Sequence, residues 1–397
     1  MDRAFATDSR PAVPAVSTKL TEAIAGYSLP VMGRPDRELL VGLNLIPHLS
    51  PRRCTELFAC FPSFDAIWGA PAAKLAAVFG SSVIGEAVAS ARDEAAIDRE
   101  LALAEDKDVT LVTLVDPEYP GLLREIDDPP LVLYVRGRLP VDPARSIAVV
   151  GTRRATRYGK MVAGRFASQL ALKGLTIVSG LAAGIDTAAH QGAIDVGGIT
   201  VAVLGCGLDY PYPKRNQPLL QTIVETGTAI SEYPLGMRPA KWTFPQRNRI
   251  LAGLSRGVLV VQAPERSGSL ITARLALEQG REVFAVPGNI NSLTSAGSNR
   301  LIKQGAQLVD SAEEILAEFP DLQQEHGQPA GEAEEDAPKL GEREQRVYDL
   351  ISLEPVHVDD IIARGDLSPT EASHILLLLQ LEGLIEEAEG GRYIRKP

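Results

Sequence analysis

Cysteine is scarce in this sequence, and so are long apolar runs. Only three cysteines occur among 397 residues, Cys54, Cys60 and Cys206, and they show no metal-ligand spacing. A small, odd number of thiols indicates a reducing compartment and disfavours a disulfide-stabilised secreted protein. No apolar run approaches the roughly 18 residues of a membrane-spanning helix, and no secretory leader is evident in the first 30 residues. We therefore expect a cytoplasmic protein with no membrane partner.

Several phosphate-binding and catalytic motifs are also missing. The sequence has neither the G-x-G-x-x-G fingerprint of dinucleotide-binding loops nor a Walker A motif, so we expect no nucleotide cofactor and no ATPase activity. No serine with a paired general base is legible, which leaves nucleophilic hydrolysis without support. Asp186 and His190 share a helix face, but no second histidine or cysteine lies nearby, so a structural role is favoured over a metal site or an acid–base pair. These absences leave ATPase activity, nucleophilic hydrolysis and a metal site without support, and we expect no metal and no cofactor.

The net charge of −11 argues by itself against a nucleic-acid partner, but this average hides an asymmetry. Residues 144–314 carry 19 lysines and arginines against 11 acidic residues, whereas the rest of the chain has a net charge of −19. A basic centre between acidic segments indicates a polyanion as the partner of the centre.

The stretch from Ile147 to Gln191 reads as strand, loop, helix, strand, loop, helix. Its apolar runs, 147–150 and 175–178, are short and continuous, as in strands that are buried on both faces. Further strands are expected at 110–114, 129–135, 200–204, 228–230, 257–261 and 282–286. The alternation predicts an α/β fold with a mostly parallel sheet, helices on both faces and a ligand site at the carboxyl ends of the strands.

Composition divides the chain into five segments. Residues 1–35 lack periodicity and are expected to be mostly disordered, while residues 36–107 read as a small helical domain. That domain is either a packing module or related to helix-hairpin-helix domains, with a core of Leu39, Leu40, Leu43, Leu57, Phe58, Phe61, Phe64, Ile67, Trp68 and Leu75. The sheet domain is expected over 108–319 and an acidic flexible linker over 320–341. Residues 342–397 predict three helices and a terminal hairpin, which together make a winged helix.

Both loops of the 147–191 stretch suit an anion. Gly151 and Gly180 let backbone N–H groups approach a phosphate, and a helix N-terminus follows each loop. Thr152, Arg153 and Arg154 come directly after the first glycine, and the two arginines add forked cationic donors. The alternative is a strand-to-helix turn whose arginines only face solvent.

A second cluster interleaves cations with aromatic residues, beginning with Lys241 and Phe244. This pattern suits single-stranded nucleic acid, because a base stacks on a ring while a cation meets its phosphate. The alternative is a solvated loop in which Phe244 is anchored in the core. The remaining candidates for the site are polar residues in this segment or at a later helix start, namely Arg247, Asn248, Ser267 and Ser269.

In this order, the motifs resemble the bacterial DNA-processing protein A family (DprA, also called Smf). The resemblance covers roughly residues 110–310. It is carried by Val150-Gly151-Thr152-Arg153, Ser179–Asp186, Ser231-Glu232-Tyr233-Pro234, Phe244–Ile250, Ser267-Gly268-Ser269 and Val286-Pro287-Gly288. It implies an extended Rossmann fold that binds single-stranded DNA without strong sequence preference. It also implies a homodimer, formed through the Rossmann domain, that protects incoming DNA and loads RecA onto it in natural transformation.

The resemblance further implies DNA contacts from Arg153, Lys241 and Phe244, while roles for Arg247, Asn248 and Ser269 are our inference from motif positions. An alternative is an enzyme that acts on a phosphorylated nucleoside, because the fold also resembles the lysine-decarboxylase-like phosphoribohydrolases. Those enzymes carry P-G-G-x-G-T-x-x-E after a strand. The corresponding run, 287–292, lacks the second glycine and the catalytic glutamate. This departure favours the DNA-binding mediator, which is not an enzyme.

The winged helix itself has little of the chemistry of a DNA reader. Its expected recognition helix, 368–381, contains no lysine or arginine and only His374, whereas groove readers normally carry cations and amides there. Residues 342–397 have a net charge of −6. We expect this domain to contact protein, or to bind DNA weakly through Arg392, Arg395 and Lys396.

Overall fold

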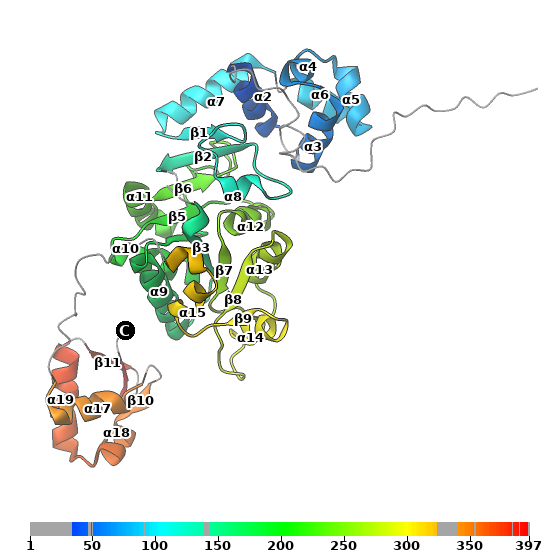
Figure 1. Cartoon of the computed structure of the whole chain (residues 1–397). Coiled ribbons are helices and arrows are strands. Elements are labelled where there is room, and N and C mark those ends of the chain that lie inside the picture. The colour runs from blue at the N-terminus through cyan, green and yellow to red at the C-terminus, as the bar shows by residue number, and fades with distance from the viewer. Residues whose placement is uncertain are drawn as a thin grey trace, which may run out of the picture.

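The computed structural model describes residues 34–46, 49, 51–90, 92–138, 143–323, 340–352, 355–382, 384–388 and 390–395. Figure 1 shows the chain running from a group of helices, through a central sheet, to a small group of helices and strands at the C-terminal end. No helix within the described ranges is long and apolar enough to cross a membrane. The disorder expected for residues 1–35 falls almost entirely outside these ranges, as does most of the linker expected over 320–341.

The N-terminal part is helical, as predicted. Its helices are α2 (Arg34–Asn44), α3 (Pro51–Cys60), α4 (Phe64–Trp68), α5 (Ala72–Phe79), α6 (Ser82–Ser90) and α7 (Glu94–Asp106). Ser63 and Asp93 begin α4 and α7, because each side chain accepts a first-turn N–H. The expected core residues are buried except Trp68, which is partly buried. This core continues into one face of the sheet, so the helices and the sheet pack together.

Within the described residues the central sheet has nine strands in the order β1-β2-β6-β5-β4-β3-β7-β8-β9. They are β1 (Thr110–Thr113), β2 (Val132–Gly137), β3 (Ser146–Val150), β4 (Thr176–Ser179), β5 (Thr200–Val203), β6 (Thr228–Ser231), β7 (Gly257–Val260), β8 (Glu282–Ala285) and β9 (Gln307–Leu308). All neighbours from β6 to β9 along this order pair in parallel, whereas β2 pairs antiparallel with both β1 and β6. The mostly parallel sheet is thereby confirmed.

Helices cover both faces of the sheet, which confirms the extended Rossmann-like architecture (Figure 1). On the face that carries Ile147 and Val149 pack α9 (Arg157–Leu172), α10 (Ile185–Asp195) and α15 (Ala312–Ala317). On the face that carries Ala148 and Val150 pack α12 (Thr243–Gly253) and α13 (Gly268–Glu278). The other described helices of this part are α8 (Gly121–Arg124), α11 (Gln217–Thr226), α14 (Ala296–Lys303) and α16 (Pro320–Gln323).

Helix α16 extends the sheet domain beyond its expected end. Leu322 is buried, and Asp321 forms an ion pair of 2.8 Å with Arg256. Residues 320–323, which were expected to belong to the linker, therefore pack against the sheet domain, because the apolar side chain of Leu322 joins its core.

The strand order reverses between β3 and β7. Strands β4, β5 and β6 follow β3 on one side, whereas β7, β8 and β9 lie on the other. Loops after β3 and β7 therefore lead toward opposite faces of the sheet and leave a crevice at the carboxyl ends of these two strands.

The C-terminal part is a winged helix, as predicted. Helices α17 (Glu342–Leu350), α18 (Val358–Gly365) and α19 (Pro369–Leu381) pack with an antiparallel sheet of β10 (Val356–His357), β12 (Arg392–Arg395) and β11 (Ile385–Ala388). The short β10 had not been predicted. In α19, Leu376 and Leu379 are buried, so much of this helix serves as core. An ion pair joins Glu386 on β11 to Arg157 at the start of α9.

Candidate nucleic-acid interface

A pocket of about 570 Å³ lies at the reversal of the strand order, where β3 and β7 end. Every site residue predicted from the sequence lines it except Gly180. Its lining cations come from three separate segments of the chain: Arg153, Arg154, Lys241, Arg247 and Arg266. Among the described lining residues, Asp186 is the single carboxylate. The pocket therefore combines anion-binding side chains with the site expected for an open α/β sheet.

The loop after β3 is held by backbone contacts and leaves its arginines exposed. The Thr152 N–H donates to the carbonyl of Gln262 at 2.8 Å, which ties this loop to the one after β7. The Thr152 hydroxyl accepts from the Arg154 N–H at 3.2 Å. Both Arg153 and Arg154 are exposed, so their guanidinium groups are accessible to an anion at the mouth of the pocket.

The loop after β4 needs its glycines for close packing. A Cβ at Gly180 would lie 2.5 Å from the guanidinium of Arg247, and Gly184 has a φ of +88° with no room toward the Thr152 carbonyl. Asp186 accepts from the Ala182 N–H at 3.3 Å and is buried. Burial raises the pKa of Asp186, while Arg247 opposes that rise. This loop therefore contributes Ala182 and Asp186 to the pocket lining and packs against the buried Arg247.

Arg247 lines the pocket but is buried, with 3% of its surface exposed. Its guanidinium donates to the carbonyl of Gly180 at 3.0 Å and to the carbonyl of Val203. Burial lowers the pKa of Arg247, and the carboxylate of Asp186 partly counteracts this. Contact of this side chain with a phosphate stays a prediction, because its observed partners are backbone carbonyls.

Helix α12 turns one face to the pocket. Phe244, Arg247, Asn248 and Leu251 recur at helical spacing along that face, and all four line the pocket. Phe244 is half-buried, and its ring lies 5.0 Å from the Arg153 guanidinium. It therefore sits at the pocket wall, with the exposed Lys241 at the loop that leads into α12.

The N-terminus of α13 also lines the pocket. Ser267 precedes the helix and accepts from the Ser269 N–H at 3.4 Å, and the hydroxyls of Ser267 and Ser269 lie 2.7 Å apart. The Asn248 amide donates to the Gly268 carbonyl at 3.3 Å, which holds α12 against α13. N–H groups at such a helix start attract an anion.

The sequence reasoning missed two lining residues whose side chains can stack on a base or bind a phosphate, Tyr212 and Arg266. The ring of Tyr212 lies 5.5 Å from that of Phe244 and is 42% exposed, and Arg266 is exposed one residue before Ser267. Arg266 could have been found from the sequence, since it directly precedes Ser267 at a predicted anion-binding helix start. Tyr212 had a weaker signal, an aromatic residue followed by Lys214 and Arg215 in a proline-containing loop.

His190 lies outside the pocket lining and has a structural environment. Its ring is fully buried, and burial lowers its pKa to about 3. The Thr200 hydroxyl donates to the Ile177 carbonyl at 2.7 Å, so it accepts from the His190 Nδ1–H, also at 2.7 Å. This favours the structural role expected for His190, and no group of possible metal ligands occurs among the described residues.

Comparison with known proteins gives matches along most of the chain. The family model described as DNA recombination-mediator protein A matches residues 110–320, and a DprA winged helix domain model matches residues 331–391. Protein Smf of Synechocystis sp. is 36% identical over 403 residues, covering 92% of this chain and 100% of that protein. DNA processing protein DprA of Bacillus subtilis is 42% identical over 234 residues, covering 59% of this chain and 79% of that protein. The X-ray structure of DprA from Streptococcus pneumoniae has a TM-score of 0.63 at 36% identity, covering 71% of this chain and 98% of that one.

Proposed function

Because this chain belongs to the DNA recombination-mediator protein A family, we propose that it binds single-stranded DNA without strong sequence preference. It protects the strand and loads RecA onto it in DNA recombination and natural transformation, in the cytoplasm, where three free cysteines stay reduced. One observation carries the proposal: the ring of Phe244 lies at the pocket wall, beside the exposed cation Arg153 and the exposed ring of Tyr212.

The arrangement suits a strand whose bases are unpaired. Arg153, Arg154 and Lys241 are exposed around the pocket and can each meet a phosphate. A base then stacks on Phe244 or Tyr212, and stacking is tolerant of sequence because every base has a π-face. The lining amide, Asn248, already donates to a backbone carbonyl, which limits its use in reading base edges. The affinity is therefore expected to depend on phosphate contacts and base stacking, and only weakly on the base sequence.

A non-catalytic role fits the pocket better than base release from a nucleotide. Asp186, the single carboxylate among the described lining residues, is buried and hydrogen-bonded to the Ala182 N–H. The run after β8 lacks the glutamate of the phosphoribohydrolases, and Gly288 exchanges two hydrogen bonds with the Asn299 side chain. No cofactor is proposed.

Binding of labelled dT oligomers, measured by fluorescence anisotropy, tests the proposal. The unsubstituted protein is expected to bind, and Arg154→Ala is expected to weaken binding. Arg165→Ala is a matched control, because Arg165 is exposed on α9 but does not line the pocket. A parallel assay for base release from nucleoside monophosphates should give no product. Base release without dT binding would instead establish the enzyme.

We also propose that the chain is a homodimer formed through the Rossmann domain. Strand β9 lies at an edge of the sheet, where unpaired backbone groups favour association. Leu308 on β9 and Leu277 on α13 are 45% and 62% exposed. Sedimentation velocity should show a dimer that dissociates with Leu277→Glu and Leu308→Glu combined. Leu172→Glu, at a leucine 58% exposed on α9, is the control and should leave the dimer intact.

A further inference from the structure

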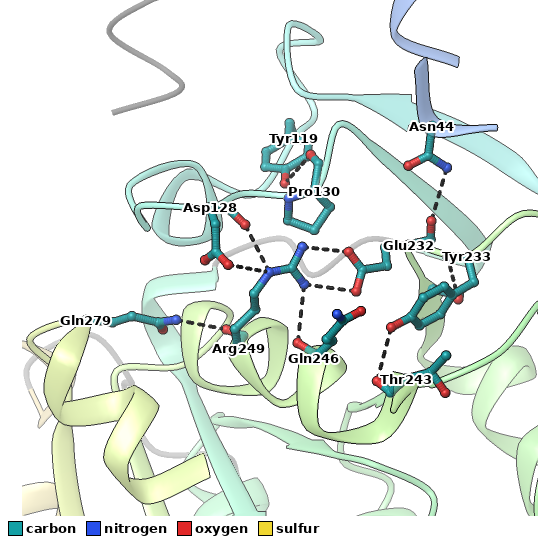
Figure 2. Close-up of polar contacts among 11 residues, drawn as sticks. Asn44, Tyr119, Asp128, Pro130, Glu232, Tyr233, Thr243, Gln246, Arg249 and Gln279 are labelled. Atoms are coloured by element: carbon teal, nitrogen blue, oxygen red, sulfur yellow. Dashed lines mark hydrogen bonds and ion pairs between the residues drawn. The ribbon is translucent and has the colours of Figure 1, made fainter. Parts of the chain in front are cut away.

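The segment 232–235 lies between the N-terminal helices and α12 (Figure 2). It follows β6 directly and contains Glu232, Tyr233, Pro234 and Leu235. Its backbone meets side chains from α2 and α7, while its own side chains reach α12. The segment is thus a polar connection between the helical domain and the helix that faces the pocket, in addition to the apolar core that they share.

Two side chains of the N-terminal domain bind this segment. Asn44, the last residue of α2, donates its amide to the Glu232 carbonyl at 3.1 Å. Glu100 on α7 is 8% exposed and accepts from the Leu235 N–H at 3.0 Å. Both lie beside the buried Tyr134 of β2, whose pKa is raised by burial and by the neighbouring carboxylate of Glu100. Burial of a carboxylate is costly unless the group is hydrogen-bonded, so the hydrogen bond from Leu235 compensates for the burial of Glu100.

On its other side the segment holds α12. Arg249 donates to both carboxylate oxygens of Glu232, at 2.9 and 2.6 Å, and also binds the carbonyl and the carboxylate of Asp128. Burial alone lowers the pKa of Arg249, but Glu232 and Asp128 outweigh this and raise it. The Tyr233 hydroxyl donates to the Thr243 carbonyl at 3.1 Å, at the first residue of α12 (Figure 2). Both the start and the middle of α12 are therefore anchored.

The orientation of α12 decides what the pocket presents. Phe244, Arg247 and Asn248 lie on the pocket face of the helix, and Arg249 lies on another face, bound to Glu232. Successive residues of a helix are separated by about 100° around its axis. A small rotation or shift of α12 thus moves the ring of Phe244 relative to Arg153 and Tyr212.

We propose that the N-terminal helical domain positions α12 for single-stranded DNA through residues 232–235. Asn44 and Glu100 are then positioning residues for binding, although neither lines the pocket. This inference rests on the proposed function and adds to it a role for the helical domain that involves no contact with DNA.

The test uses the full chain with Asn44→Ala and Glu100→Ala combined. Its Kd for dT oligomers is expected to rise about five- to tenfold, in the range of couplings between separate sites. Glu105→Ala is the matched control, because Glu105 is an exposed residue on the same helix α7. When Glu100→Gln replaces Glu100→Ala in the double variant, binding should recover, since the amide oxygen of glutamine still accepts from the Leu235 N–H.

A spectroscopic readout follows α12 directly. Trp242 precedes α12, is 43% exposed and packs edge-to-face on Tyr233 at 6.1 Å between centroids. In a Trp68→Phe background it is the only tryptophan of the chain. The double variant should shift its emission without DNA present, whereas Glu105→Ala should not. If the double variant does not fold, Asn44→Ala alone, which removes one hydrogen bond, takes its place in both measurements.

The outcomes separate the two proposals. If the unsubstituted chain binds dT and the folded variant binds within twofold of it with unchanged Trp242 emission, the positioning role is refuted and the proposed function stands. If the unsubstituted chain does not bind dT, the proposed function fails and the inference fails with it. Weaker binding that Glu100→Gln does not restore would also overturn the positioning role.

Discussion

Replacing Phe244 with leucine isolates the stacking of a base on its ring. The half-buried ring has the Arg153 guanidinium at 5.0 Å and the Tyr212 ring at 5.5 Å, and Gly205 lies against it. Leucine keeps apolar contact with Gly205 but has no π-face. Stacking contributes about 1–3 kcal/mol per base, so the Kd for dT oligomers should rise about 5- to 150-fold.

The competing role for Phe244 is an anchor in the core, and thermal stability distinguishes the two. Phe244 is outside the set of buried core residues, and hydrophobic swaps of similar volume cost less than about 1.5 kcal/mol. The Tm of Phe244→Leu should therefore fall by only a few degrees. Anisotropy titrations run beside thermal melts measure both quantities, and Phe244→Tyr, which keeps the ring, should bind like the unsubstituted chain. A Leu variant with unchanged Kd would refute stacking, and a large loss of Tm would identify a core anchor.

Three further predictions concern charge. Lys241→Ala should reduce the slope of log affinity against log salt by about 0.7, the share of one phosphate on a single strand; an unchanged slope would remove Lys241 from the site. A chain ending at residue 323 should bind dT as tightly as the full chain or slightly more tightly. The reason is that the winged helix is acidic and its Glu386 pairs with Arg157, three residues after the lining residue Arg154. Tenfold weaker binding, roughly 1.4 kcal/mol, would show that this domain touches DNA. His190, with a pKa of about 3 in the native state against the ordinary histidine value of 6.5, binds protons mainly when unfolded between those values. Its contribution to the free energy of unfolding should therefore fall with pH below 6.5, by about 1.4 kcal/mol at pH 5.5. Urea titrations give the change in the free energy of unfolding between neutral pH and pH 5.5. This change should be larger for the unsubstituted chain than for His190→Gln by this amount, and equal pH dependence would contradict the buried neutral ring.

Much of the architecture could be predicted from the sequence because it follows from local patterns of apolar and polar residues. Short apolar runs that alternate with helical periodicity indicated the parallel sheet. The eight expected strands lie within a few residues of their expected positions, whereas the short β9 had not been predicted. The helical core at the N-terminus and the winged helix followed from the same reasoning. Gly151, Thr152 and Arg153 identified the pocket, because a loop after a buried strand must lie at the carboxyl rim of the sheet.

The sequence by itself determined which chemistry is present: arginines and hydroxyls after strands, and cations interleaved with aromatic residues. Only the tertiary structure decided which of these groups are accessible. Arg247 and Lys241 look alike in sequence, yet Arg247 is buried against two backbone carbonyls while Lys241 is exposed. Arg247 lies on α12 and Lys241 in the loop that leads into it, and Arg249 anchors this helix through its contacts with Glu232 and Asp128. Such contacts join residues up to 121 positions apart, and local sequence patterns carry no information about distances of that kind.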